Sequence, residues 1–214
     1  MSDGSKRKYE LRRRAAHMEA TRLRIAEAAM ELHGTVGPAR TTVTAVAERA
    51  GVQRHTVYRH FPTDDHLFTA CSGLWAERVP VPDIARWRAI SDPGERLAAG
   101  LDELYRWYEQ AEPMLANIIR DAPLVPLVAA HRAPLDGLFA EAARALAAGR
   151  PRRKAVTAAV GHAVAFETWR SLARDGGLGR AQAVALATAM VDAAATGAGD
   201  PRTRAAAAAR AAAG

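Results

Sequence analysis

Residues 53–60 concentrate side chains that can donate hydrogen bonds. These donors are Gln53, Arg54, His55, Thr56, Tyr58, Arg59 and His60. Only Val57 is apolar, and it can pack inward from a short helix. Such donors fit either a solvated surface or a ligand rich in acceptors, and the base edges and phosphates of DNA are such a ligand.

Two short helices joined by a glycine turn must position these donors. Thr41 or Thr42 can cap a first helix of about nine residues, with Val46 and Ala47 on its inner side. Gly51 stops that helix and can adopt the positive φ that the turn requires. This geometry can place the second helix in a major groove about 12 Å wide. The spacing therefore predicts a helix-turn-helix.

Two further helices flank this pair. One is expected over about 21–33, where apolar residues recur at helical spacing before Gly34. The other is expected over about 64–79, with Thr63 placed to cap it. The helix-turn-helix domain is therefore predicted over 19–64, and the helix after it links the domain onward.

Two runs of residues in this region are distinctive. They are Thr42-Val-Thr-Ala-Val-Ala-Glu-Arg-Ala-Gly-Val and Tyr58-Arg-His-Phe-Pro-Thr. The segment that holds them closely resembles the DNA-binding domain of TetR-family regulators, over roughly residues 20–75, and the resemblance implies an all-α homodimer. It also implies that Thr42 and Thr44 anchor the DNA backbone. The groove-facing residues that it implies are Gln53, Arg54, His55, Tyr58 and His60, with Arg54 as the base reader.

One position departs from the family pattern. The family often has a lysine just after the cap of the helix at 64–79, where this chain has Asp64 and Asp65. The resemblance therefore implies that a usual phosphate contact is missing. The backbone amides at that helix end still attract phosphate, although the two carboxylates compete for them.

The start of the chain is strongly basic. Residues 1–24 hold eight Lys or Arg against three acidic residues, in a chain of 214 residues with a net charge of +7. We expect a flexible basic arm over 1–18. Beside a DNA-binding motif such an arm can reach phosphates or the minor groove, and a solvated tail is the alternative.

Residues 80–197 form a larger helical domain that is expected to bind an effector. Asp92 and Pro93 open one helix, and prolines separate a segment at 113–121 from a helix over about 133–148. Short, interrupted helices leave space between them, so we expect a mostly apolar small-molecule pocket, with plain core packing as the alternative for each residue. The candidate lining residues are Trp107, Met114, Leu115, Ile118, Phe139, His162, Phe166 and Trp169.

The last helix, expected over roughly 180–196, is apolar around most of its girth. Its polar residues form one thin stripe of Thr188, Asp192 and Thr196. Such a helix must be buried on more than one side. We therefore expect a homodimer formed by the last two helices of each subunit, with a helix buried inside a monomeric core as the alternative. An Ala-rich tail, expected to be disordered, follows over 198–214.

Other classes of function lack the residues they need. Cys71 is the only cysteine, so neither an intrachain disulfide nor a cysteine-based zinc site is expected. His162 and Glu167 lie on different faces of a helix, so we expect no metal site. No nucleophile with a base and no phosphate-binding glycine loop is recognisable, which predicts no enzyme activity and no cofactor. Without a signal peptide or an apolar span, the expected location is the cytoplasm, not the membrane.

These features together predict an all-α, ligand-responsive transcriptional regulator. We expect binding to double-stranded palindromic operator DNA as a homodimer and release by a small, largely apolar effector, and the resemblance to the TetR family implies that the regulator is a repressor. The alternative is a non-specific architectural DNA-binding protein without an effector. A footprint on one defined palindrome separates the two.

Overall fold

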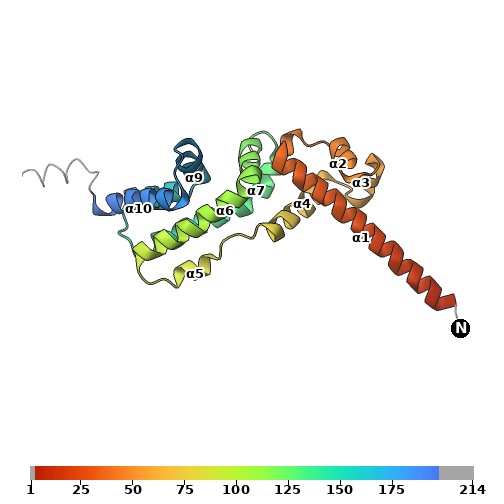
Figure 1. Ribbon diagram of the computed structural model, residues 1–214, viewed down its shortest axis with the longest axis horizontal. Coiled ribbons are helices and arrows are strands. Elements are labelled where there is room, and N and C mark those ends of the chain that lie inside the picture. Colours follow the sequence, from red (N-terminus) through yellow and green to blue (C-terminus); the bar gives the residue numbers. More distant parts are fainter. Residues whose placement is uncertain (1–2, 198–214) are drawn as a thin grey trace, which may run out of the picture. The chain divides into compact units, whose positions relative to one another are not determined.

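The computed structural model describes residues 3–197, with side chains from residue 7 onward, and these residues form helices joined by turns (Figure 1). No strand occurs within this range, so the expected all-helical fold is confirmed. The chain divides into two compact units. The first combines residues up to Pro80 with Ala111–Ala133, and the second combines Val81–Gln110 with the residues from Pro134 onward. The predicted tail at 198–214 lies outside the described residues.

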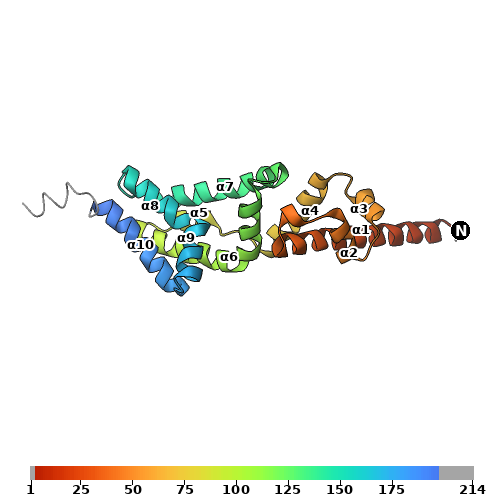
Figure 2. The same ribbon diagram turned by 90° about the horizontal axis from the view of Figure 1, so that it is seen from above.

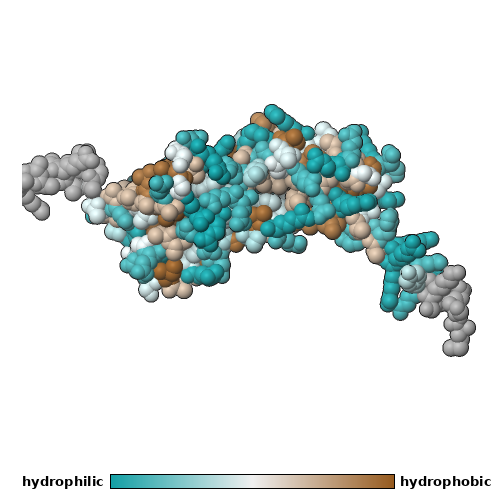
Figure 3. All heavy atoms as spheres, in the orientation of Figure 1, coloured by the Kyte–Doolittle hydropathy of each residue, from teal (hydrophilic) through white to brown (hydrophobic). Residues whose placement is uncertain are grey.

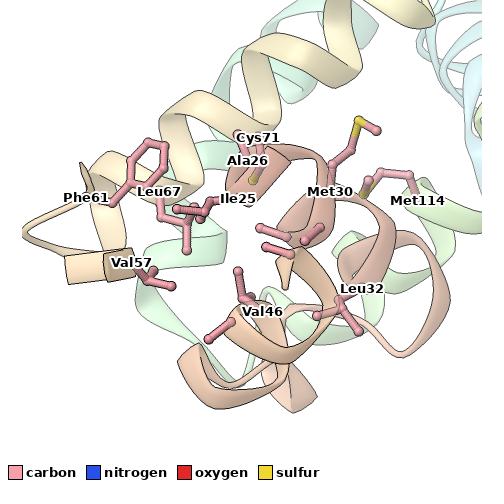
Figure 4. Packing of buried hydrophobic residues seen from close by; sticks show 14 residues of the cluster. Ile25, Ala26, Met30, Leu32, Val46, Val57, Phe61, Leu67, Cys71 and Met114 are labelled. Carbon is pink, nitrogen blue, oxygen red and sulfur yellow. The ribbon is translucent and has the colours of Figure 1, made fainter. Parts of the chain in front are cut away.

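The first unit contains the predicted helix-turn-helix. Its helices are α1 (Asp3–Thr35), the 3-10 turn η1 (Pro38–Arg40), α2 (Val43–Ala50), α3 (Arg54–His60) and α4 (Asp64–Arg78). Ile25 of α1, Val46 of α2 and Val57 of α3 point into one aliphatic core (Figure 4). Burial of these side chains holds the two short helices against α1, because neither is long enough to be stable alone.

The ends of α2 and α4 follow the predicted capping chemistry. The hydroxyl of Thr42 accepts a hydrogen bond from the amide of Ala45 at 3.1 Å. Gly51 ends α2 with a left-handed φ of 64°, and the hydroxyl of Thr63 accepts a hydrogen bond from the amide of His66. These caps satisfy amides and carbonyls that a helix end leaves without partners.

Helix α1 is longer than the sequence pattern indicates. It begins at Asp3, not near Thr21, so residues 3–18 continue the helix and do not form the separate arm that we expect from composition. Apolar periodicity marks a helix only where it packs on a core, and residues 7–20 are all exposed. Good helix formers such as Arg, Ala, Leu and Glu supply the helical preference there.

The C-terminal end of α6 (Pro93–Asp121) belongs partly to this first unit and holds the end of α1. The side-chain amide of Asn117 donates to the carbonyl of His33 at 2.9 Å. The guanidinium of Arg120 donates to the carbonyl of Val36 at 3.0 Å. Both acceptors lie at the end of α1, where carbonyls lose their helical partners.

Asp121 completes this contact. Its carboxylate accepts from the amide of Ala39 at 3.0 Å and from the guanidinium of Arg120. The hydrogen bond from Arg120 lowers the pKa of Asp121, and the amide of Ala39 adds to that effect. Gly37 passes beside this pair with φ of 92°, and a Cβ atom there would overlap Arg120 and Asp121. The connection from α1 to α2 is therefore closely packed.

The second unit contains α5 (Ile84–Arg88), most of α6, much of α7 (Pro126–Ala147), α8 (Lys154–Val164), α9 (Phe166–Arg170), the π-helical turn η2 (Ser171–Asp175) and α10 (Arg180–Thr196). The segment expected at 113–121 is not a separate helix but the end of α6, which continues through Pro113. A proline in a helix removes one backbone hydrogen bond, and packing along the rest of this long helix compensates for it. Likewise α7 begins at Pro126, several residues before the predicted start.

Two tyrosines of α6 stabilise the break between α8 and α9. Ala165 is extended there, with ψ of 136°, so the carbonyls before it lose helical partners. Tyr105 donates its hydroxyl hydrogen to the carbonyl of Ala163 at 2.9 Å, and Tyr108 donates to the carbonyl of Val164. Burial raises the pKa of Tyr108 well above its usual value, so this donor stays protonated.

No helix within residues 3–197 combines the length and the apolar character that crossing a lipid bilayer demands.

Candidate DNA-binding site

The orientation of α3 exposes most of the predicted DNA-binding residues. Val57 is only 1% exposed and packs into the core of the first unit. Side chains of a helix point outward all around its axis, so the side of α3 away from Val57 is exposed to solvent. The exposed residues of α3 are Arg54, His55, Tyr58 and Arg59, and Gln53 precedes them at the N-cap position.

Arg54 and Tyr58 contact each other on this exposed face. The guanidinium donates to the tyrosine hydroxyl at 3.3 Å, and its central carbon lies 5.7 Å from the ring centroid. The hydrogen bond to Tyr58 raises the pKa of Arg54, so the cation is maintained. This contact restricts the arginine rotamer before any ligand binds, which lowers the entropy lost on binding. A guanidinium held in this way can donate two hydrogen bonds to a guanine edge.

The start of α2 offers a second set of donors. Thr42 is exposed at the N-cap, where its hydroxyl oxygen already accepts the amide of Ala45 and its hydrogen remains available. Thr44 is exposed in the first turn. Amides at a helix N-terminus attract anions, so this end suits a backbone phosphate.

The other two predicted residues of α3 lie at its flank. Thr56 and His60 are half-buried and line a hollow of about 400 Å³ between α1 and the turn from α2 to α3. Burial, followed by the positive charges of Arg59 and Arg22, lowers the pKa of His60. The imidazole is therefore neutral at pH 7, and its Nε2 atom has no hydrogen-bond partner in the described structure.

The wall of this hollow on α1 includes residues that motif reasoning misses. His17, Thr21 and Arg24 recur at helical spacing and face the hollow beside Gln53 and Arg59. Their spacing is the signal that could reveal them, because it forms a polar stripe next to the apolar stripe of α1.

The start of α4 carries Asp64 and Asp65 where the family often has a lysine, and one of these two carboxylates has a structural partner. Asp65 pairs with the imidazole of His131 on α7 at 2.9 Å, inside the same unit. Phe68 lies between His131 and His33, with ring centroids 4.7 and 4.9 Å away. Asp65 thus joins α4 to α7, and Asp64 stays exposed at the helix start.

The eight predicted pocket residues are divided between the two units. Met114, Leu115 and Ile118 belong to the first unit, where Met114 joins the core around Ile25. In the second unit His162 is exposed and its ring contacts the hydroxyl of Thr168. The remaining four, also in the second unit, are Trp107, Phe139, Phe166 and Trp169.

Those four aromatic residues gather around Tyr108, which the sequence-based list omits. The ring centroids of Phe166, Trp107, Trp169 and Phe139 lie 5.4, 5.5, 5.6 and 6.0 Å from that of Tyr108. Trp169 is fully buried, and its indole N–H has no partner among the described residues. An orphaned donor of this kind is uncommon in a folded protein.

Comparison with known proteins agrees with this geometry. The family model described as "Bacterial regulatory proteins, tetR family" matches residues 25–71. The HTH-type transcriptional repressor KstR of Mycobacterium tuberculosis is 31% identical over 136 residues, and the match spans 61% of this chain and 60% of KstR.

Solved structures share the fold. A TetR-like transcriptional regulator from Rhodococcus sp. RHA1 has a TM-score of 0.58 at 19% identity, covering 79% of this chain and 92% of that one. The regulator FadR from Bacillus subtilis, solved in complex with stearoyl-CoA, has a TM-score of 0.51 at 18% identity, covering 81% and 97%.

The helices α2 and α3 and the turn between them form a helix-turn-helix, within the segment that matches the family model. Over residues 25–71 the chain is similar to the TetR family of bacterial transcriptional regulators.

Proposed function

We propose that this regulator is a repressor that binds a palindromic operator as a homodimer and is released by a small-molecule effector. The observation that carries the proposal is the exposed donor face of α3, on which Arg54 and Tyr58 are held together. Arg54 reads a base edge, Tyr58, His55 and Arg59 contact the groove or its walls, and the remaining proposed contacts come from Thr42, Thr44, Gln53, Thr56 and His60.

The homodimer forms through α8 and α10. Within one chain α10 packs on α8 and buries Ala183, Ala187 and Val191. Another side of α10 stays exposed and carries Leu186, which is 51% exposed, next to small alanines that allow close helix approach. A two-fold partner that covers this side would give the assembly two copies of α3, one for each half of a palindrome whose half-sites lie about 34 to 36 Å apart.

The effector binds in the second unit, against the aromatic cluster around Tyr108. A largely apolar ligand suits these rings, and one acceptor atom on it would satisfy the buried N–H of Trp169. The complex of FadR with stearoyl-CoA makes long-chain acyl thioesters the first compounds to test. A ligand at 100 times its Kd would stabilise the protein by about 2.7 kcal/mol, which a thermal-shift panel detects.

Selection of duplexes from random-sequence DNA tests the function. We expect the wild-type protein to enrich one palindrome and to give a footprint over both half-sites. The alternative of a non-specific architectural protein predicts retained DNA without an enriched sequence. An enriched duplex that is released by a compound from the thermal-shift panel would support both parts of the proposal.

A further inference from the structure

The N-terminal half of α1 extends beyond the helix-turn-helix as a straight helix (Figure 2). All its residues from 7 to 20 are exposed, and this end of the helix has a hydrophilic surface (Figure 3). Residues 7–24 contain seven Lys or Arg against two Glu. Among the described residues, none of these seven cations forms an ion pair. The extension is thus a continuous, strongly basic helix whose cations form no ion pair with the described side chains.

Helical periodicity assigns these cations to two sides of α1. Arg14 and Arg7 lie seven and fourteen residues before Thr21, and residues seven apart share one helix face. Thr21 lines the hollow beside α3, so Arg7 and Arg14 continue the side of α1 that meets the recognition helix. Lys8 and Arg12 lie roughly 140° and 180° around the helix from Thr21, on the other side.

The length of the extension matches a DNA partner. From Thr21 to Arg7 the helix rises about 21 Å, which corresponds to about six base pairs along a strand. Duplex DNA lying against α3 has regularly spaced phosphates over that distance, and each can exchange its counterion for an arginine.

A lipid surface fits the extension less well. A membrane-binding helix gathers its apolar side chains on one face. Here Leu11 and Met18 lie on the stripe of Thr21, whereas Tyr9 and Leu23 lie roughly on the opposite side. The exposed apolar residues therefore do not form one lipid-facing side, and the arginine stripe next to α3 favours DNA.

We infer that the N-terminal half of α1 binds phosphates of the duplex flanking the half-site that α3 reads, and that Arg7 and Arg14 make these contacts. The inference rests on the proposed function, because it assumes that α3 lies in a DNA groove. It assigns to α1 a sequence-independent contribution to affinity, separate from base reading.

The test compares two double variants that each remove two positive charges from the full-length protein. R7Q/R14Q changes the side that continues to α3, and K8Q/R12Q changes the other side. The probe is a duplex that the wild-type protein enriches from random-sequence DNA, used once with its two half-sites alone and once with flanks longer than about six base pairs. Far-UV circular dichroism checks that both variants keep their helical content.

On the flanked duplex, R7Q/R14Q should weaken binding on the order of tenfold and lower the slope of log K against log salt by about 2 for each protomer. K8Q/R12Q should stay close to the wild type, and on the short duplex all three proteins should bind alike. Equal losses in the two variants, or an unchanged slope in R7Q/R14Q, would overturn the inference.

Three outcomes would contradict the inference or the function on which it rests. If R7Q/R14Q loses binding to phosphatidylglycerol vesicles while its DNA slope is unchanged, the extension is a membrane element and the inference is wrong. If R7Q/R14Q keeps the wild-type slope on an enriched duplex, only this inference fails. A wild-type protein that enriches no duplex overturns the proposed function, and this inference with it.

Discussion

The two units use their conspicuous side chains differently. In the first unit an aliphatic core around Ile25 and Val46 supplies the stability, and the donors of α3 remain outside it. In the second unit the aromatic rings around Tyr108 form the interior themselves. The hydroxyls of Tyr105 and Tyr108 also donate hydrogen bonds to the backbone carbonyls at the break between α8 and α9. The polar side chains of α3 do not build the core, so their exposure indicates a binding surface. The aromatic side chains around Tyr108 do build the core, so their residue types alone do not indicate a ligand site.

The largest expected effect tests whether the first unit depends on assembly through the second. L186E places a charge on the exposed apolar side of α10 and should give monomers with operator affinity reduced at least a hundredfold, because each monomer reads only one half-site. A181E is the control, since Ala181 is exposed on the side of α10 that carries Asp192. Light scattering and gel shift report the two properties. A wild-type monomer at micromolar concentration would contradict the proposed dimer.

Gly37 tests how tightly the first unit holds its α1–α2 connection. G37A forces alanine into a positive φ and overlaps Arg120 and Asp121, so we expect a loss of about 2 to 5 kcal/mol in the free energy of unfolding. G73A in α4 meets no atom within 4 Å and should be neutral or slightly stabilising. Thermal denaturation compares the two, and equal stability would mean that the connection is not constrained.

His33 should make the first unit sensitive to acid. Burial lowers its pKa to about 4, although the charge of Asp121 opposes the shift. Because the unfolded chain binds a proton near pH 6.5 and the folded chain only near 4, stability should fall by about 3 kcal/mol as the pH drops through that window. H33L should lack this part of the pH dependence in urea titrations. An identical pH profile in the variant would contradict the assignment.

Arg54 and Tyr58 test the exposed face directly. R54A and Y58A should each weaken specific operator binding by about 1 to 3 kcal/mol while the dimer stays folded. Because the two side chains contact each other, the double variant should lose less than the sum of the single losses. Gel shifts on the selected duplex measure the affinities of the wild type, the two single variants and the double variant. Unchanged binding in both single variants would show that α3 does not read the operator.

The smallest effect belongs to the second unit. Y105F removes the hydroxyl that serves the carbonyl of Ala163 and should cost about 1 to 2 kcal/mol of stability. Operator affinity per folded dimer should not change, because this tyrosine lies outside the first unit. Denaturant unfolding and gel shift on the same samples separate the two. A specific loss of DNA binding would show that the two units are coupled through this residue.

The sequence by itself determined the helix-turn-helix. The cap at Thr42, the turn at Gly51, the inward Val57 and the dense donors of α3 depend on contacts between near neighbours, which local spacing encodes. The resemblance to the TetR family rests on those same residues, so this segment predicts both the family resemblance and the fold class.

Only the tertiary structure decided the rest, because it depends on contacts between residues distant in the chain. The contacts of Asn117 with the end of α1 and of Asp121 with η1 cross more than 80 positions, and no local pattern predicts them. The central position of Tyr108 in the aromatic cluster depends on rings brought together from α6, α7 and α9. The sequence pattern does not predict the extension of α1, because an exposed helix needs no apolar stripe and apolar periodicity marks a helix only where it is buried.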